Sequence, residues 1–245
     1  MTRTVENIVP APERVVLGRN LTYGLLETLG RSIVVGEYRE KPFPNEAELA
    51  EMHGVSRSVT REAVKMLTAK GLLGARPKQG TFVQPESAWA LFDTDVLRWL
   101  LDRKSSILLV RQFNELRLGV EPEAAALAAQ RGNLADIEGI AIALDRMQHA
   151  ERGDGDALDA DIAFHVAVLI ASGNPFLVQF RSMVPTALRT SIRYTNRIAG
   201  RTASISDHAA VHEAIAAGDA AAAKQAMTVL IEDVLRLIEG MTDLP

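Results

Sequence analysis

The chain contains no cysteine, which excludes disulfide bonds and thiolate metal sites. It also lacks a long apolar run, because no uninterrupted stretch approaches the roughly 20 residues that a membrane-spanning helix needs. The first residues, MTRTVENIVPAPERVV, lack the apolar centre of a secretory signal peptide. These absences predict a soluble cytoplasmic protein that has no membrane partner.

The 245 residues are 47% hydrophobic, which is enough for a packed core in one large domain or two modest ones. Up to Gln84 there are twelve Lys and Arg against nine Asp and Glu, whereas the remainder has fifteen against twenty-two. This change of sign within a net charge of −4 predicts a domain boundary just after Gln84. We expect an arm at residues 1–19, a first domain at 20–84, a linker at 85–93 and a second domain at 94–245.

The stretch from Phe43 to Val83 predicts two short helices joined by a tight turn. Asn45 is typical of an N-cap for a helix ending near Met52, and Ser56 for a second helix ending near Lys70. Between them, Gly54 can adopt a backbone conformation that other residues resist. An apolar stripe over residues 21–35 predicts one more helix before this pair, while Pro10 and Pro12 argue against helix in the preceding arm.

Two short extended segments, residues 72–73 and 81–83, flank a polar tip at residues 76–80. Helix, turn, helix and hairpin is the order of a winged helix-turn-helix, whose second helix lies in the major groove of DNA. The hairpin tip would then reach phosphates or the minor groove. The fold class expected for the first domain is therefore a winged helix-turn-helix with a small β-hairpin wing.

Charge in the same stretch is locally basic although the whole chain is acidic. Between Arg57 and Lys78, Glu62 is the only acid. Contact with phosphate requires such a local cationic face rather than a positive whole-protein charge. Ordinary solvated charges on an amphipathic helix are the alternative, but the ordered motif favours binding to double-stranded DNA. The basic residues are Arg57, Arg61, Lys65, Lys70, Arg76 and Lys78.

This stretch resembles the DNA-binding domain of the GntR family of bacterial transcription regulators. The resemblance implies DNA contacts from the second helix and from the wing. Ala47 departs from the pattern, because many relatives carry a DNA-contacting arginine there, so the operator sequence is expected to differ. The matching motifs are FPNE with ELA, GVSR, REA, GLL and GTFV, and the expected DNA-binding residues are Ser56, Arg57, Ser58, Arg61, Arg76, Lys78, Gln79 and Gly80.

The remaining sequence is helical in pattern and lacks the alternation of β-branched residues that strands show. Glycine-containing pairs such as Gly132-Asn133 and Gly173-Asn174 separate the helices as capping signals. Pro122 and Pro185 lie within helical patterns and are expected to kink them. The prediction is an all-α bundle of six or seven helices. The expected helices cover residues 95–102, 107–130, 134–152, 157–172, 175–199, 204–217 and 220–239.

This half resembles the FCD effector domain of the FadR subfamily within the GntR family. Residues 89–99, WALFDTDVLRW, are similar to the linker and first helix of galactonate-responsive repressors in that subfamily. The resemblance implies a homodimer whose second domain binds a small effector. The motifs that carry it are ELR with EP at residues 115–122, LAA at 127–129, Asp161 with Phe164-His165, ASGNP at 171–175, Asp207-His208, and AI with GD at 214–219.

Asp161 and His165 lie four residues apart, so their side chains leave one face of a helix about one turn apart. In an apolar helix they need partners, and a divalent cation such as zinc, nickel or manganese is one that suits both. His208, on another helix, could close the site, and the FCD resemblance implies that these three residues are metal ligands. The same resemblance places a fourth ligand at about Leu230, which cannot bind metal, so water or effector oxygens would fill the remaining positions.

Arg117 is the second candidate for effector binding, because its planar guanidinium matches a carboxylate with two parallel hydrogen bonds. A structural ion pair with Glu121, four residues later, is the alternative. Arg193 is a further candidate that could equally face solvent. The full expected effector site is Arg117, Asp161, His165, His208 and Arg193.

Two classes of function are compatible with such residues. A metal-dependent enzyme acting on a small carboxylate would also need a placed general acid or base, a nucleophile elbow or a phosphate loop, and the sequence offers none. The sequence instead favours a ligand-controlled DNA-binding regulator without catalysis. The expected protein is a homodimeric repressor that leaves a palindromic operator when a sugar acid, such as an aldonate, binds.

Overall fold

The computed structural model describes residues 13–76, 80–103, 107–199 and 204–242, with only the backbone described at 13–19, 192–199 and 241–242. The chain divides into two compact units, Met1–Trp99 and Leu100–Pro245. The boundary falls after Trp99, so the expected linker at residues 85–93 and the residues just after it belong to the first unit. The side chains of Trp89 and Trp99 are only 7% and 1% exposed. These residues therefore pack into a core, which an exposed linker would not do.

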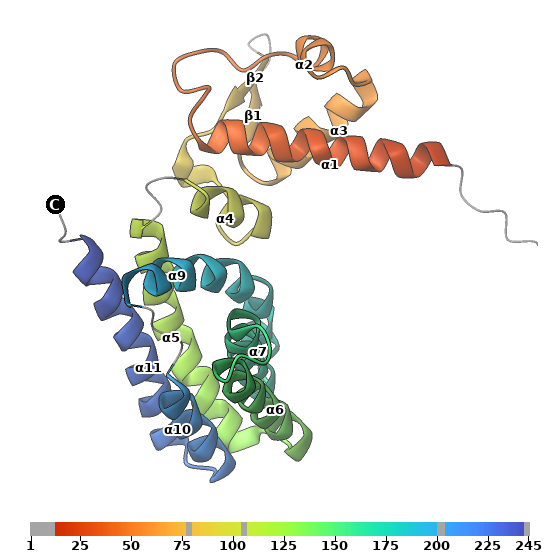
Figure 1. Ribbon diagram of the computed structural model, residues 1–245. Coiled ribbons are helices and arrows are strands. Elements are labelled where there is room, and N and C mark those ends of the chain that lie inside the picture. The colour runs from red at the N-terminus through yellow and green to blue at the C-terminus, as the bar shows by residue number, and fades with distance from the viewer. Residues whose placement is uncertain (1–12, 77–79, 104–106, 200–203, 243–245) are drawn as a thin grey trace, which may run out of the picture. The chain divides into compact units, whose positions relative to one another are not determined.

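The first unit is the winged helix-turn-helix that the sequence predicts (Figure 1). Strands β1 and β2 pair antiparallel, and Arg76 stands opposite Gly80 at the end of the hairpin. Its elements are α1 (Glu13–Val34), α2 (Glu46–His53), α3 (Arg57–Ala69), β1 (Leu73–Arg76), β2 (Gly80–Val83), the 3-10 turn η1 (Glu86–Ala88) and most of α4 (Thr94–Leu101), the helix within which the boundary falls.

The capping predictions in this unit are confirmed. The Asn45 side chain accepts hydrogen bonds from the backbone of Ala47 and Glu48, and the Glu48 carboxylate accepts one from the backbone N–H of Asn45. This reciprocal capping box fixes where α2 begins. Gly54 ends α2 at φ 63°, a left-handed conformation that glycine adopts without steric penalty.

Helix α1 begins at Glu13, so the prediction of an irregular arm reaching residue 19 was wrong from that residue onward. A proline disfavours helix before its own position and is tolerated in a first turn, so Pro10 and Pro12 do not prevent a helix from Glu13 onward. Residues 1–12 lie outside the described residues. Further along, α1 packs against α3 and buries Leu25, Leu26 and Leu29.

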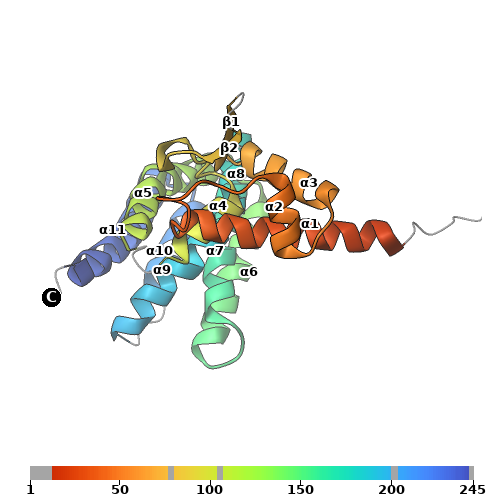
Figure 2. The ribbon, with the colours of Figure 1, turned by 90° about the horizontal axis from the view of Figure 1, so that it is seen from above.

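The second unit is an all-helical bundle, as predicted. Helices α5 and α11 run side by side, an arrangement visible in both Figure 1 and Figure 2. Helix α7 packs on α6, α5 and α9, and its Phe164 and Leu169 are completely buried in the core. The helices are α5 (Ile107–Arg131), α6 (Leu134–Glu151), α7 (Ala157–Ala171), α8 (Pro175–Gln179), α9 (Val184–Ala199), α10 (Ile205–Ala216) and α11 (Ala220–Thr242), with the 3-10 turn η2 (Phe180–Ser182) between α8 and α9.

The single helix expected over residues 175–199 is interrupted by η2, so that prediction was wrong. Pro185 does not kink a helix interior, because it lies in the first turn of the new helix α9, where its missing N–H has no helical partner to lose. Pro122, in contrast, lies inside α5 as predicted. Within the described residues, no helix is both long and apolar enough to span a bilayer.

Candidate DNA-binding face and buried carboxylate–histidine cluster

The N-terminus of α3 presents two hydroxyl groups. Ser56 caps the helix by accepting a hydrogen bond from the Val59 N–H, and its hydroxyl lies 2.9 Å from that of Ser58. Both serines are exposed. Free N–H groups and the positive end of the helix dipole favour an anion at such a terminus. The two serines therefore stand where a DNA phosphate would be favoured.

One exposed stripe of α3 is cationic. Arg57, Arg61 and Lys65 follow one another at four-residue spacing, and all three are exposed. The opposite face, which includes Ala63 and Leu67, is buried against the rest of the unit. Lys65 lies 3.7 Å from Glu62, but Arg57 and Arg61 make no ion pair with any residue that the structure describes. The two guanidinium groups are therefore available to a polyanion.

The wing contributes one described cation. The Arg76 guanidinium lies 4.5 Å from the centre of the Phe82 ring on the opposite strand, which stiffens the arginine while leaving it exposed. Gly80 is exposed at the start of β2. The predicted contacts Lys78 and Gln79 lie outside the described residues.

Lys70 does not belong to the exposed basic face on which the sequence analysis placed it. Its side chain is only 13% exposed, and its ammonium group lies 2.7 Å from Asp93 and 2.9 Å from Asp95. Burial alone would lower the pKa of Lys70, but the hydrogen bonds that its ammonium group donates to these two carboxylates raise it. Lys70 therefore ties the end of α3 to the start of α4, and its charge is already paired within the unit.

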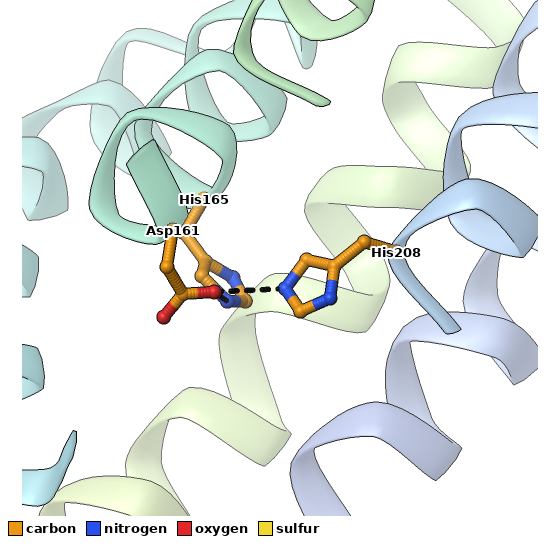
Figure 3. Close-up of side chains that lie close together, drawn as sticks. All are labelled: Asp161, His165 and His208. Carbon is orange, nitrogen blue, oxygen red and sulfur yellow. Dashed lines mark ion pairs between the residues drawn. The ribbon is translucent and has the colours of Figure 1, made fainter. Parts of the chain in front are cut away.

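Asp161 and His165 of α7 meet His208 of α10 inside the second unit (Figure 3). The Nε2 atom of His208 lies 2.9 Å from Oδ1 of Asp161, and Nε2 of His165 lies 3.8 Å from the same oxygen. The three residues are between 2% and 5% exposed. The structure thus brings together the three metal ligands that the FCD resemblance implied.

The protonation of His208 can be read from its other nitrogen. Nδ1 lies 2.7 Å from the backbone carbonyl of Ser204, which can only accept, so Nδ1 carries the proton and donates it. Neutral His208 then presents a lone pair at Nε2, close to the acceptor Oδ1 of Asp161. Both atoms are buried without a hydrogen-bond partner in the described structure. Two acceptors that close together need a proton or a cation between them, and a divalent metal ion fits this set of ligands.

Arg117 of α5 lies next to this cluster, but its guanidinium is already paired. Nε lies 2.6 Å from Oε1 of Glu121, Nη2 lies 3.2 Å from Oε2, and Nη1 donates to Asn114. Both members of the pair are buried. The structure therefore contains the ion pair that the sequence analysis kept as the alternative to effector binding. Asn114 also donates to Ser191 of α9, which connects α5 to α9.

The surroundings keep both buried carboxylates ionised. Burial would raise the pKa of Glu121, but the charge of Arg117 and the hydrogen bonds that His165 and Arg117 donate lower it to about 2. For Asp161, burial likewise raises the pKa, and the contacts with His208, His165 and Arg117 outweigh it and lower the pKa. An ionised carboxylate is the form that ligates a metal and accepts hydrogen bonds.

A small pocket adjoins the ion pair. The pocket is lined by Phe113, Leu116, Arg117, Val120, Glu121, Leu169, Phe180 and Val184.

Two other residues of the predicted site do not join the cluster in the described structure. Leu230, which takes the position of the expected fourth ligand, is buried among core residues. The Arg193 side chain lies outside the described part of α9.

Comparison with known proteins agrees with both halves of this description. The model of "Bacterial regulatory proteins, gntR family" matches residues 24–83, and the FCD domain model matches residues 112–233. The galactonate operon transcriptional repressor of Escherichia coli K12 is 35% identical over 227 residues, which cover 91% of this chain and 99% of that protein. The chain belongs to the GntR family. Its FCD domain places it in the FadR subfamily, and it is a transcription regulator rather than an enzyme.

Other GntR-family relatives extend the comparison. LutR of Bacillus subtilis 168 is 33% identical over 199 residues, covering 78% of this chain and 89% of that one. The Uxu operon transcriptional regulator of E. coli K12 is 31% identical over 205 residues, covering 80% and 78%. A solved structure of Lar, described as controlling the Listeria monocytogenes agr system, aligns at a TM-score of 0.55 with 18% identity, over 92% of this chain and 97% of that one. This last similarity concerns the fold alone.

Sequence reasoning on this GntR-family regulator did not find every residue at the buried site. Glu121 was considered only as a partner for Arg117, although it also contacts His165. Asn114 and Ser191 were missed. The available signal was the spacing of Asn114, Arg117 and Glu121 at three and four residues, which places all three on one face of α5.

Proposed function

We propose that this GntR-family regulator is a homodimeric repressor that leaves a palindromic operator when a small carboxylate binds its FCD domain. The carboxylate would be a sugar acid of the aldonate class. The observation that carries this proposal is the buried cluster of Asp161, His165 and His208, because two of its acceptor atoms lie close together without a partner. The name of the galactonate operon repressor supports the class of effector, since that relative spans nearly the whole chain.

The DNA-binding part of the proposal rests on α3 and the wing. Arg57 and Arg61 would contact bases or adjacent phosphates, and Ser56 and Ser58 would contact phosphate at the helix N-terminus. Arg76, Lys78, Gln79 and Gly80 would contact DNA from the wing. Two copies of the chain would place two such helices on two half-sites.

Asp161, His165 and His208 would hold a divalent cation, and Leu230 adds no fourth ligand. When bound, the cation supplies a positive charge and coordination positions for effector oxygens. The chain's own residues bury this site and fix the directions of the two imidazoles. Arg117 and Arg193 are the proposed further contacts for the effector, and a bound carboxylate would have to compete with Glu121 for Arg117.

Control of DNA affinity requires that the effector bind one arrangement of the dimer more tightly than the other. The effector would then favour an arrangement in which the two winged domains no longer match the operator. By linkage, operator DNA must weaken effector binding by the same factor.

The DNA-binding assignment is tested by selecting bound duplexes from a random pool and measuring their affinity by fluorescence anisotropy at fixed salt. Arg57→Ala should weaken binding to the selected duplex about tenfold or more, because it removes a contact to base or phosphate. Lys224→Ala is the matched control, since it removes the same charge from an exposed ion pair on α11. Equal affinity of the Arg57 and Lys224 variants would contradict the assignment.

The effector class and the metal are tested together by thermal shift. Aldonates should raise the melting temperature of the wild type, a chelator should abolish this rise, and Asp161→Ala should lack it. Stabilisation that survives the chelator would remove the metal from the proposal. No stabilisation by any aldonate, with or without added zinc, would remove the effector class.

A further inference from the structure

Glu121 is in contact with two different partners, and only one of them is an arginine. Its Oε2 atom lies 2.6 Å from Nδ1 of His165, a residue 44 positions later on α7. The carboxylate and the imidazole are both about 2% exposed. Such a short contact between two enclosed polar groups fixes the position of both side chains.

The direction of the hydrogen bond follows from the chemistry of the carboxylate. Glu121 also accepts two hydrogen bonds from Arg117, so it is ionised and can only accept. Nδ1 of His165 must therefore carry a proton and donate it. In the neutral ring this leaves Nε2 with the lone pair, and Nε2 is the atom that lies 3.8 Å from Asp161.

His208 reaches the same state by a different route, because its Nδ1 donates to the Ser204 carbonyl. Both imidazoles thus carry their lone pair at Nε2: that of His208 lies 2.9 Å from Oδ1 of Asp161, and that of His165 lies 3.8 Å from the same oxygen and 3.2 Å from Nη2 of Arg117. A backbone carbonyl holds one ring, and a side-chain carboxylate holds the other. Arg117 in turn holds that carboxylate, and Asn114 holds Arg117.

We infer that Glu121 is the positioning residue of the metal site, and that Arg117 keeps Glu121 in place to fix the Nδ1–H tautomer of His165. This inference rests on the proposed function, because it concerns the same cluster. Glu121 does not touch the ion itself. It acts through His165 by holding the ring proton on Nδ1 and so keeping it off Nε2, in the way that carboxylates hold ligating histidines in other metal proteins.

The test uses the full-length protein, Zn²⁺ as the only ligand, and a double variant, Arg117→Met with Glu121→Met. Removing both charges avoids leaving either one buried alone. Zinc affinity, measured by competition with a chelating dye, should fall about 10- to 100-fold. The matched control is Glu123→Met with Lys224→Met, an exposed pair that also joins α5 to another helix, and its zinc affinity should stay unchanged.

A second measurement reads the tautomer directly. In metal-free wild type at alkaline pH, the ¹⁵N shifts of His165, assigned with a His165→Gln variant, should show the Nδ1–H form. The double variant should lose this preference.

The outcomes separate this inference from the proposed function. If wild-type protein binds no zinc, the metal part of the proposed function and this inference fail together, whereas if it binds zinc the tautomer of His165 decides the inference alone. If the double variant does not fold, the wild-type tautomer again decides. An Nε2–H tautomer in wild type, or unchanged zinc affinity in a folded double variant, would overturn it.

Discussion

Each unit contains a network of charged side chains that joins helices, and water reaches the network of the first unit but not the buried network of the second. The surface network of the first unit joins α1, α3 and α4 through side chains that remain 13% to 38% exposed. The buried network of the second unit joins α5, α7 and α10 through side chains that are at most 7% exposed. The surface network comprises Glu27, Lys70, Asp93, Asp95 and Arg98, and the buried network comprises Arg117, Glu121, Asp161, His165 and His208.

The difference in exposure determines what each network can contribute. Water can replace any contact of the surface network, so each contact adds little stability and serves mainly to hold α4 on its unit. In the buried network no water replaces a lost partner, and an unpaired charge there is strongly destabilising. Apolar side chains could fill the same space without that risk. The buried network is therefore the one that stability alone does not explain.

Breaking the buried network on one side should have the largest effect. Glu121→Met leaves the Arg117 guanidinium enclosed without its carboxylate, and the free energy of unfolding should fall by about 3–5 kcal/mol. Urea unfolding followed by circular dichroism measures this loss, since the second unit is helical throughout its described residues.

Two controls define that result. Both tryptophans, Trp89 and Trp99, lie in the first unit, so the fluorescence transition should move less than the dichroism transition. The double variant with Arg117→Met should recover most of the loss, because no charge is then left alone. A double variant as unstable as Glu121→Met would show that lost packing, and not the unpaired charge, causes the effect.

The next largest effect tests how tightly α4 is held in the first unit. A Cβ atom added at Gly30 of α1 would lie 2.4 Å from the Trp99 ring, which is buried and bonded through its indole N–H to Glu27. Gly30→Ala should therefore destabilise the first unit by about 1–3 kcal/mol. Tryptophan fluorescence during urea unfolding is the measurement.

Gly24 provides the matched control on the same helix, because a Cβ atom there meets nothing within 4 Å. Gly24→Ala should be neutral or stabilising by up to about 1 kcal/mol, as expected where alanine replaces glycine in an exposed helix. If both substitutions had the same effect, the close approach of Trp99 to α1 would not be a constraint on the fold.

Local signals in the sequence predicted much of this fold. The caps Asn45 and Ser56, and the turn at Gly54, depend on side chains within a few residues, and the structure confirms them. The break between α8 and α9 was missed because residues 180–182 contain no glycine or proline to mark it. Pro185 then suggested a kink where it in fact opens a helix.

In the candidate site, too, local sequence signals predicted some residues and could not predict others. Asp161 and His165 share a helix face, so their spacing alone brings them together, whereas His208 was placed beside them only through the family resemblance. The contact of Glu121 with its second partner, His165, could not be predicted from the sequence, because His165 is 44 residues away and on another helix. Contacts between helices depend on packing, and helical periodicity gives the face of each helix without giving its neighbour.

Acid should lower the stability of the first unit by a smaller amount, because it protonates Glu27 of the surface network. Hydrogen bonding to Arg98 lowers the pKa of Glu27 from 4.5 to about 2, against the effect of partial burial, with Trp99 and Arg31 also lowering it. Because the folded-state pKa is the lower one, this contribution is present above about pH 4.5 and is lost as the pH falls toward 2. Solvent exposure limits it to about 1 kcal/mol.

Glu27→Gln isolates that contribution. The difference in unfolding free energy between wild type and variant, followed by tryptophan fluorescence, should be largest near neutral pH and should shrink between pH 4.5 and about 2. A difference that stayed constant over this range would mean that the Glu27 contacts with Arg98 and Trp99 act through shape and not through charge.

The smallest effect is expected at an ion pair whose distance alone would suggest a strong one. Lys224 lies 2.6 Å from Glu123, a contact as short as that between Arg117 and Glu121, but both side chains are more than half exposed. Replacing both by methionine should change the unfolding free energy by less than about 0.5 kcal/mol, and raising the salt should not alter that difference measurably. A loss above about 1 kcal/mol, measured by circular dichroism in urea, would show that distance outweighs exposure in this protein. The contrast between the two networks would then have to be explained by geometry instead of access to water.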